Sequence, residues 1–259
     1  MPVQDQQPLR PHPVLGAYYP SAEQRRQRVD AMFDNSAPHY DWITKVMSFG
    51  SGQWYRRQAL QRSGVDAGMR VLDVGAGTGG VSLLAQEIVG ANGLVVAHDP
   101  SAGMLGEASR QGVRHAVQGL GEQLSYPDNS FDRVTMGYAL RHVADLRVLF
   151  TEYARVLKPG GKVLLLEITR PEHVVSRGLL RVYLRGIVPL VTRLARRSAP
   201  AQELMRYYWD TIEHCVPPAT ILEAMAAAGL AGPDRRVELG IFSEYSASKP
   251  ARSQTGGEQ

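Results

Sequence analysis

Short apolar runs alternate with longer amphipathic runs between Arg70 and Ile168. The short runs are rich in Val and Leu and are bounded by Gly, Pro or Asp, which is typical of buried strands. They predict strands at 70–74, 94–99, 114–118, 131–137 and 161–168. The longer runs repeat apolar residues at the i, i+3, i+4 spacing of amphipathic helices, at 81–89, 102–110 and 144–157. This alternation predicts an α/β fold in which helices cover both faces of a parallel sheet.

Helical patterns also flank this core. They cover 22–63, with breaks expected near 35–38 and 49–52, and then 174–197, 201–214 and 219–228. The runs at 235–240 and 241–248 predict an antiparallel hairpin that closes the sheet. The segment Lys158-Pro159-Gly160-Gly161 is expected to end a helix and to turn the chain into the last parallel strand. We expect a single domain over 21–249, with helical lid elements at 21–63 and 172–214.

The two ends of the chain differ from this body in composition. Residues 1–20 contain five prolines and lack the apolar segment of a targeting signal, so we expect a flexible, untargeted extension. Residues 250–259 are polar, and we expect a disordered tail there.

Length and composition limit the class of protein. The chain has 259 residues, 44% of them hydrophobic and 21% charged, which suits a globular domain with a sizeable core. No run approaches the roughly 18 apolar residues of a membrane span. The lone cysteine, Cys215, excludes an internal disulfide and a multi-cysteine metal site, and it fits a reducing, cytoplasmic setting. We expect no metal site, and we expect Cys215 to be a small core residue.

The net charge of +4 is unevenly distributed. Segment 170–197 holds seven arginines and one acid and thus contributes +6, which leaves −2 for the rest of the chain. This distribution, without zinc-finger spacing or a basic patch with interleaved aromatics, argues against a nucleic-acid partner. In 176–197, Arg177, Arg181 and Arg185 share one helical stripe. The adjoining apolar face consists of Leu180, Tyr183, Leu184, Ile187 and Val188. Such a helix either lies weakly on an anionic membrane surface or covers the core with a solvated charged face.

The sequence VLDVGAGTGG at 71–80 places four glycines in six positions directly after the first strand. Glycine loses more backbone entropy on folding than any other residue, so this segment indicates a turn that needs a bare backbone. In α/β sheets, the turn from the first strand into the first helix binds nucleotides. We expect Gly75 and Gly77 to permit a tight turn and close approach to a ligand, and Gly79 to permit close helix packing.

Two acids indicate which nucleotide the turn accepts. Asp73 lies directly before the turn, where it disfavours a pyrophosphate and favours a cationic amino or sulfonium group. Asp99 ends the second strand, where an acid can accept hydrogen bonds from both hydroxyls of a ribose. An acid for a cation and an acid for a ribose together indicate S-adenosylmethionine (SAM). The structural alternative is a plain turn with an aspartate that caps a strand.

These residues resemble the class I SAM-dependent methyltransferases, and three longer segments narrow the resemblance. The segments are MFDNSAPHYDWITKVMSFG (32–50), LSYPDNSFDRVTMGYALRHVAD (124–145) and RVLKPGGKVLLLEITRP (155–171). They are similar to the ubiquinone/menaquinone C-methyltransferase family, the UbiE type. The resemblance implies a Rossmann-like class I methyltransferase fold with a mostly parallel seven-stranded sheet and a C-terminal antiparallel hairpin. It also implies SAM as cofactor and a small aromatic or quinol substrate.

The resemblance also implies cofactor contacts. They fall on or beside the residues Thr78, Asp99, Pro100, Leu120, Gly121, Glu122 and Gly137. Met104, in the helix after Asp99, is expected to pack beside the adenine. The chain departs from the family at two of these positions. Leu120 replaces an Asn or Asp and Gly137 replaces a usual serine, so we expect two hydrogen bonds to the cofactor to be absent.

Four residues are candidates for the chemistry. Arg141 matches the arginine of the family's Leu-Arg-Asn element, His142 replaces its asparagine, and Tyr40 and Asp41 match its N-terminal Tyr-Asp. Removing a phenolic proton from a hydroquinone raises electron density at the adjacent ring carbon, which can then take a methyl group. The base is either His142 or a water held by Arg141, while Tyr40 and Asp41 close over the pocket. Each has a structural alternative: a packing arginine, a hydrogen-bonded core histidine, or caps of the lid helix.

Three functional classes stay open at this point. The first is a SAM-dependent C-methyltransferase acting on a quinol or a related lipid-like aromatic. The second is an O- or C-methyltransferase of a soluble specialised metabolite. The third is a SAM-fold protein that binds without methyl transfer or uses SAM for other chemistry. The substrate, the methylated atom and the oligomeric state do not follow from the sequence.

Overall fold

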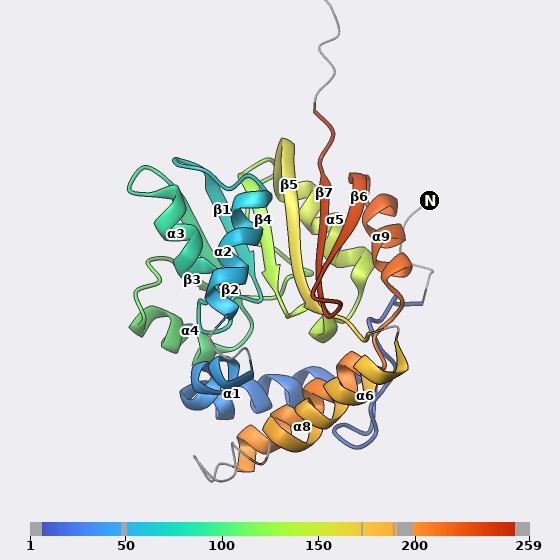
Figure 1. Cartoon of the computed structure of the whole chain (residues 1–259). Helices are drawn as coiled ribbons and strands as arrows, with labels where there is room; N and C mark the ends of the chain where they lie inside the picture. Colours follow the sequence, from blue (N-terminus) through green and yellow to red (C-terminus); the bar gives the residue numbers. More distant parts are fainter. Residues whose placement is uncertain (1–6, 48–50, 172, 189, 191–198, 252–259) are drawn as a thin grey trace, which may run out of the picture.

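The computed structural model describes residues 7–47, 51–171, 173–188, 190 and 199–251. In these ranges seven strands form one sheet: β1 Arg70–Val74, β2 Leu94–Asp99, β3 Ala116–Gln118, β4 Phe131–Gly137, β5 Leu157–Ile168, β6 Ala231–Glu238 and β7 Phe242–Ser248. Their order is β3-β2-β1-β4-β5-β7-β6 (Figure 1). The first five strands are parallel, and β7 runs antiparallel to both β5 and β6. The predicted α/β sheet with a closing hairpin is confirmed.

Helices cover both faces of the sheet, as the alternating pattern predicted. One face carries α2 (Gly52–Arg62), α3 (Ser82–Val89) and α4 (Ala102–Arg110), and the other carries α5 (Leu146–Val156) and α9 (Pro218–Ala227) (Figure 1). The period of two in β1 explains this division. Val71 packs in a cluster with residues of α2 and α3, whereas Leu72 packs in a cluster with residues of α5 and α9. Both are fully buried, so the central strand is apolar on both faces.

A third layer lies across the ends at which the parallel strands finish. It contains α1 (Ala22–Met47), α6 (Val174–Val182), the π-helical turn η3 (Tyr183–Ile187) and α8 (Ala199–Glu213) (Figure 1). This layer has its own hydrophobic core, formed by Tyr19, Val29, Met32, Leu184, Val188, Leu204, Met205, Tyr207, Tyr208, Trp209 and Ile212. The carboxyl edge of a parallel sheet is where α/β folds bind ligands, so this layer roofs the expected site. That 21–249 forms a single domain stays a prediction.

Two of the differences from the sequence-based expectation have a clear physical cause. Helix α1 continues through Pro38, where a break was predicted. Proline removes one backbone hydrogen bond, but the packing of α1 against α8 and α4 outweighs that loss. Strand β5 begins at Leu157, directly after α5, because the expected turn at Lys158–Gly161 is a bulge within the strand. Gly160 takes φ +79° there, which only glycine adopts readily. The second expected break, at 49–52, falls largely outside the described residues.

The N-terminal segment is not the flexible extension that its prolines predicted, at least from Gln7 onwards. Tyr19 is 1% exposed and packs into the core of the third layer. The carbonyl of Leu9 accepts a hydrogen bond from the Leu146 amide, and the carbonyl of Pro11 accepts one from Val216. Proline fixes φ and so favours extended chain, which here is ordered by docking on the body. Residues 1–6 and 252–259, including most of the expected tail, lie outside the described residues.

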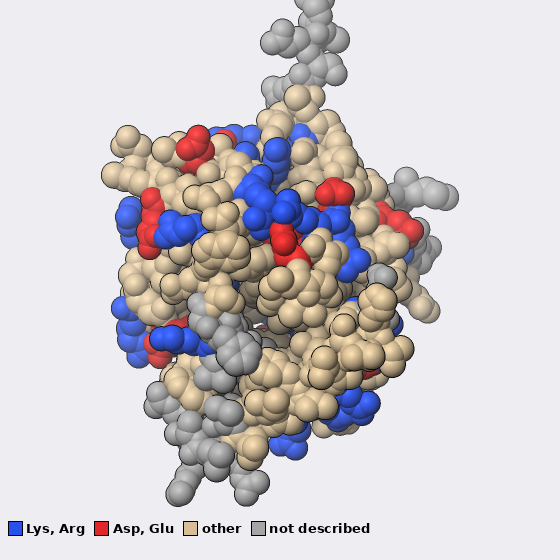
Figure 2. Space-filling view, in the orientation of Figure 1, with Lys and Arg blue, Asp and Glu red and all other residues tan. Residues whose placement is uncertain are grey.

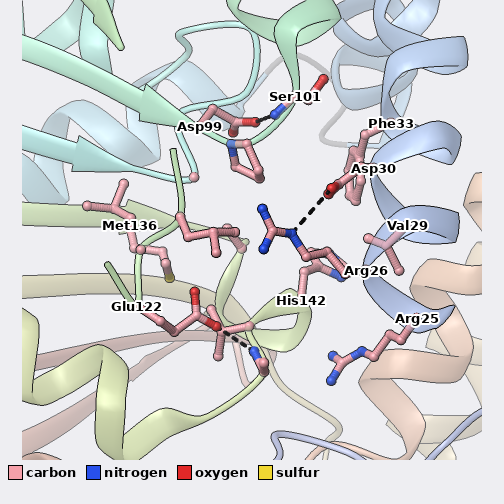
Figure 3. A pocket seen from close by; sticks show the side chains of 18 of the residues that line it. Arg25, Arg26, Val29, Asp30, Phe33, Asp99, Ser101, Glu122, Met136 and His142 are labelled. Atoms are coloured by element: carbon pink, nitrogen blue, oxygen red, sulfur yellow. Dashed lines mark hydrogen bonds and ion pairs between the residues drawn. The ribbon is translucent and has the colours of Figure 1, made fainter. Parts of the chain in front are cut away.

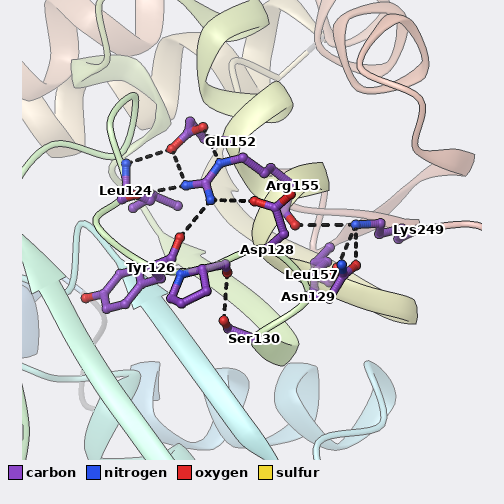
Figure 4. A network of polar contacts seen from close by, with 10 residues as sticks. Leu124, Tyr126, Asp128, Asn129, Ser130, Glu152, Arg155, Leu157 and Lys249 are labelled. Carbon is purple, nitrogen blue, oxygen red and sulfur yellow. Dashed lines mark hydrogen bonds and ion pairs between the residues drawn. The ribbon is translucent and has the colours of Figure 1, made fainter.

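The loop between β3 and β4 is fixed by one arginine of α5. Arg155 donates hydrogen bonds to the carbonyls of Leu124 (2.8 Å) and Tyr126 (2.7 Å), and it pairs with Glu152 and Asp128 (Figure 4). The polar network therefore anchors the loop that begins with the candidate adenine residues. No sequence pattern singled out this arginine.

Candidate functional site

The glycine turn after β1 takes the conformation that its sequence indicated. Gly75, Gly77 and Gly79 have φ of +65°, +56° and +88°, all in the left-handed region. A Cβ on Gly75 would lie 2.4 Å from the Cβ of Ala139, and one on Gly79 would lie 2.6 Å from Val113. Gly77 differs, since a Cβ there would meet nothing within 4 Å. The turn thus uses two glycines for close packing and one to leave the backbone open to a ligand.

Asp99 joins this turn to the end of β2. One of its carboxylate oxygens accepts the Gly77 amide at 2.8 Å and the other accepts the Ser101 amide at 2.8 Å. The side chain is 7% exposed and lines a cavity beside the turn. Burial raises the pKa of this carboxyl from 3.8 to about 6. Each carboxylate oxygen keeps a further lone pair, so Asp99 can still accept hydroxyl donors from a ribose.

Asp73 lies beneath the turn, as expected, but its carboxylate does not face a ligand cavity. Its carboxylate is fully buried beneath the turn, accepts the hydroxyls of Ser82 (2.6 Å) and Thr135 (2.8 Å), and lines neither cavity described below. Burial raises its pKa to about 6. In this arrangement Asp73 is therefore not placed to contact the amino group of a cofactor directly. The carboxylate instead fixes α3 and β4 against the turn.

Two cavities flank the turn. The first has a volume of about 460 Å³ and the second about 420 Å³, and both are within the range of small-molecule sites. Nine cofactor candidates line the first cavity (Figure 3): Gly75, Gly77, Asp99, Pro100, Met104, Leu120, Gly121, Glu122 and Gly137. Thr78 lines the second, and Gly79 lines neither. The cavities meet at Tyr40, Gly75, Gly77, Gly137 and Tyr138, which line both.

The two departures from the family have local structural consequences. Leu120 lines the first cavity, and its carbonyl oxygen lies 3.2 Å from Nε2 of the buried His98. At Gly137 a Cβ would lie 2.9 Å from Cγ2 of Val81, so a serine would not fit without a shift of that valine. Val81 therefore occupies the space that a larger residue at position 137 would need.

Tyr40 and Asp41 bring the C-terminal half of α1 over the turn. The Tyr40 hydroxyl lies 2.7 Å from the hydroxyl of Tyr208 in α8. Asp41 accepts a hydrogen bond from the Thr78 hydroxyl at 2.5 Å and another from the amide of Gln111. Asp41 therefore ties α1 to the glycine turn, whereas Tyr40 reaches the junction of the two cavities. Of the two residues Tyr40 and Asp41, only Tyr40 lines the first cavity.

Arg141 is not aimed into either cavity. It lies in the short 3₁₀ helix η2 (Leu140–His142), is 1% exposed, and forms a buried ion pair with Glu167 at 2.9 Å. It also donates to the Thr211 hydroxyl at 2.8 Å and lies over the ring of Tyr208. The structure thus places Arg141 behind the site, as a packing arginine that fixes η2 to β5 and α8.

His142, the next residue, does line the first cavity. Its Nδ1 lies 3.3 Å from the Tyr207 hydroxyl, its ring stacks on Tyr207, and Phe33 meets it edge-on. Nε2 is buried and has no hydrogen-bond partner among the described residues. Burial, together with the cations Arg141 and Arg25, holds the pKa of His142 well below 6.5. The ring is therefore neutral at pH 7, and an unpaired nitrogen remains in an apolar, aromatic wall.

The sequence reading missed several residues of this wall. His12 comes from the expected flexible extension and Arg25 from the expected helical lid element, and both line the first cavity. Phe33 and Tyr208 also line it. The adjacent tyrosines at 207 and 208 were a usable signal, since a pair of aromatics on an amphipathic helix must bury at least one ring. Among the described residues, no group of His, Cys, Asp or Glu side chains is arranged to hold a metal ion. In the same ranges no helix is long and apolar enough to cross a bilayer.

Comparisons with known proteins agree with this geometry. Residues 21–244 match the model of the ubiE/COQ5 methyltransferase family. Curated relatives include two proteins named ubiquinone/menaquinone biosynthesis C-methyltransferase UbiE. The one from Shewanella piezotolerans is 33% identical over 80% of this chain and 84% of its own length, and the one from Hahella chejuensis is 34% identical over 80% and 85%.

Solved structures show the same fold at lower identity. A SAM-dependent methyltransferase from Aquifex aeolicus superposes with a TM-score of 0.57 at 19% identity, over 80% of this chain and 97% of that one. The [4+2]-cyclase SpnF superposes with a TM-score of 0.62 at 17% identity, over 87% and 96%. The turn, the acid at the end of β2 and the family match lead to one conclusion: the chain belongs to the ubiE/COQ5 methyltransferase family and is a SAM-dependent methyltransferase.

Proposed function

We propose that the protein methylates a ring carbon of a quinol or a related lipid-like aromatic. The observation that carries this proposal is the unpartnered Nε2 of His142 in an aromatic-lined cavity that adjoins the glycine turn. The relatives named above are C-methyltransferases of ubiquinone and menaquinone biosynthesis, which supports the same substrate class here.

The residues present fit SAM. The open backbone of Gly77 and the carboxylate of Asp99 would hold the nucleoside, with Met104 and Leu120 beside the adenine and Gly137 near the methionine moiety. Thr78 lines the second cavity. The cations of that lining, Lys45, Arg56 and Arg57, outnumber its acids, Asp41 and Glu87, and an excess of cations suits a carboxylate. When bound, SAM supplies a methyl group on a positively charged sulfur, which an electron-rich carbon can accept.

His142 is the residue of this chain that can move the proton. With Nδ1–H donated to Tyr207, Nε2 keeps a lone pair without a partner among the described residues, and this lone pair would accept the proton of a ring hydroxyl. The O–H bond then breaks, its electron pair stays on the oxygen, and density rises at the adjacent ring carbon. After the carbon takes the methyl group, loss of its ring proton and return of a proton to the oxygen restore the aromatic phenol. Tyr40 and Tyr208 would orient the ring from the lid.

Replacement of His142 tests this assignment. We expect His142→Ala to lower kcat for a hydroquinone by about 10²–10⁴-fold, the usual contribution of a general base, while SAM affinity stays near that of the wild type. His142→Asn should behave similarly, because an amide cannot take the proton. Cys215→Ser, at a residue outside both cavities, is the matched control. An unchanged kcat in both His142 variants would show that His142 is not the general base.

A second proposal concerns the outer face of α6, and it corrects the face expected from the sequence. Leu184 and Val188 are buried against α8, while Leu180 and Tyr183 are partly buried there. Of the expected face, only Ile187 is open to solvent, at 48% exposed. It joins an exposed apolar stripe formed by Val174, Val175, Leu179, Val182 and Leu190, each 55–83% exposed. Arg177 and Arg185 pair with Glu213 and Asp210 of α8, which leaves Arg181 as an exposed cation on α6. The rest of the expected segment, 191–197, lies outside the described residues.

We propose that this stripe docks on an anionic bilayer surface, which would bring the enzyme to a lipid-like quinol. Separate groups of Lys and Arg side chains lie at the lower rim of the molecule, where Figure 1 shows α6 and α8 (Figure 2), and such cations complement anionic headgroups. We expect flotation with vesicles that contain phosphatidylglycerol at low salt and release at high salt, because the attraction is screened. Leu179→Ser should weaken flotation and Val148→Ser, an exposed apolar residue of α5, should not. Failure to float at low salt would leave a soluble aromatic as the substrate.

A further inference from the structure

Arg25 is a buried cation at the wall of the first cavity. Its side chain extends from α1 towards the cavity, close to His142 (Figure 3). The residue is 6% exposed. Its Nη2 donates to the carbonyl of Arg141 at 2.9 Å and to Nε2 of His12 at 3.1 Å. Its Nε is buried and has no hydrogen-bond partner among the described residues. Both of these acceptors, a carbonyl and an imidazole nitrogen, are neutral.

His12 cannot balance the charge of Arg25. Nδ1 of His12 lies 2.7 Å from the carbonyl of Pro13, so the ring donates there and accepts from Arg25 at Nε2. Burial and the neighbouring guanidinium lower the pKa of His12 to about 4, which keeps the ring neutral at pH 7. The N-terminal segment therefore contributes an acceptor to Arg25 but no negative charge.

The acids that line the same cavity are engaged elsewhere. Asp30 pairs with Arg26, and Glu122 accepts the amide of Ala144. Among the ion pairs of the described residues, none involves Arg25, whereas the other buried arginine of this region, Arg141, has Glu167. The ionisable groups that face Arg25 or share its cavity are Arg10, His12, Tyr19, Glu23, Arg26, Asp30, Tyr40, Asp99, Glu122, Tyr138, Arg141, His142, Asp145, Tyr207 and Tyr208.

A cation buried without an anionic partner is costly, and an anion that enters beside it offsets that cost. We propose that Arg25 is an anion subsite of this cavity, which holds the ionised oxygen of the aromatic substrate. The inference rests on the proposed function, in which that oxygen loses its proton to His142. The O–H bond breaks, the proton passes to Nε2, and the electron pair stays on an oxygen that the guanidinium faces. Arg25 would thereby favour the phenolate from which the ring carbon draws its electron density.

The test uses a phenol whose ionisation is visible, so it needs no methyl transfer. The full-length protein is titrated with 4-nitrophenol, and the yellow phenolate is followed by absorbance between pH 5 and 9. We expect the wild type to lower the apparent pKa of the bound probe by about one to three units, the usual effect of an adjacent guanidinium on an acid. Arg25→Met should abolish the shift, and Arg25→Lys should retain part of it. Arg28→Met, on the same helix but paired with Glu203 at the surface, should leave the shift unchanged.

Competition distinguishes a phenolate from a carboxylate and remains informative if Arg25→Met does not fold. In the wild type, benzoate should displace bound nitrophenolate at least several-fold better than benzamide does, because only benzoate carries a charge. An unshifted probe pKa in the wild type, or an equal shift in a folded Arg25→Met, would overturn the proposal. Tight benzoate binding with an unshifted nitrophenol would also overturn it, in favour of a carboxylate-bearing substrate. A shifted probe in a protein that methylates no phenol would instead retain the subsite and contradict the proposed function.

Discussion

Removal of the Arg141 guanidinium should destabilise the fold rather than the chemistry alone. Arg141 and Glu167 form an ion pair at 2.9 Å with both side chains at most 4% exposed, and Arg141 also donates to Thr211. In Arg141→Met the Glu167 carboxylate would keep, among the described residues, only the Leu140 amide as a donor at 2.9 Å. Stranding one charge of a buried pair costs about 3–5 kcal/mol of unfolding free energy. For a chain of this size that corresponds to a fall in Tm of about 6–20 °C.

The assay is urea unfolding followed by circular dichroism, with Glu167→Leu and the double variant Arg141→Met/Glu167→Leu beside the single one. Replacing both charges by apolar side chains should recover much of the loss, because no unpaired charge remains. Activity per folded molecule should recover with stability. If Arg141→Met unfolds within about 1 kcal/mol of the wild type, the structural assignment is wrong. If the double variant is stable but inactive, Arg141 belongs to the catalytic site after all.

Two further predictions concern the turn. Gly75→Ala should prevent normal folding because its Cβ would meet Ala139. Gly77→Ala should cost only about 1–2 kcal/mol of unfolding free energy for its φ of +56°, and it should mainly weaken SAM binding. Thermal unfolding and calorimetry with S-adenosylhomocysteine measure both effects, and a Gly77→Ala variant that is less stable than Gly75→Ala would contradict the prediction. The pKa of Asp99 is raised from 3.8 to about 6, so the folded state binds the proton more tightly and unfolding free energy falls as pH rises from about 4 to 6. Asp99→Asn should therefore gain up to about 3 kcal/mol relative to the wild type across that window, and a difference independent of pH would contradict this.

The regular part of the fold followed from the sequence because its signals are local. Strands β1, β2 and β4 and helix α4 have the bounds that apolar runs and their flanking residues predicted. Helix α4 shows such a local contact, because the side chain of its N-cap residue Ser101 accepts a hydrogen bond from the Met104 amide. The break expected at Pro38 was wrong because long-range packing of α1 outweighs a local propensity.

Only part of the site could be predicted from the sequence, because only part of it is specified by local signals. The glycine turn and Asp99 are adjacent to a strand end, so a short motif specifies their positions. The direction in which a side chain points after that motif depends on distant neighbours. Arg141 and His142 are consecutive, yet Glu167 of β5 draws one behind the site while the other lines the cavity. His12 reaches Arg25 only because the N-terminal segment docks on the body, and no local pattern indicated that contact.

The most direct test of the central claim is to determine which atom of the substrate receives the methyl group. The purified protein would be incubated with SAM labelled with ¹³C in its methyl group and with a polyprenyl hydroquinone, and the product analysed by mass spectrometry and ¹³C NMR. The account predicts one label on a ring carbon, formed by the wild type and nearly lost in His142→Ala. A label on oxygen, or transfer only to soluble phenols in the same panel, would contradict ring methylation of a quinol. No transfer to any phenol despite SAM binding would contradict the proposed reaction altogether.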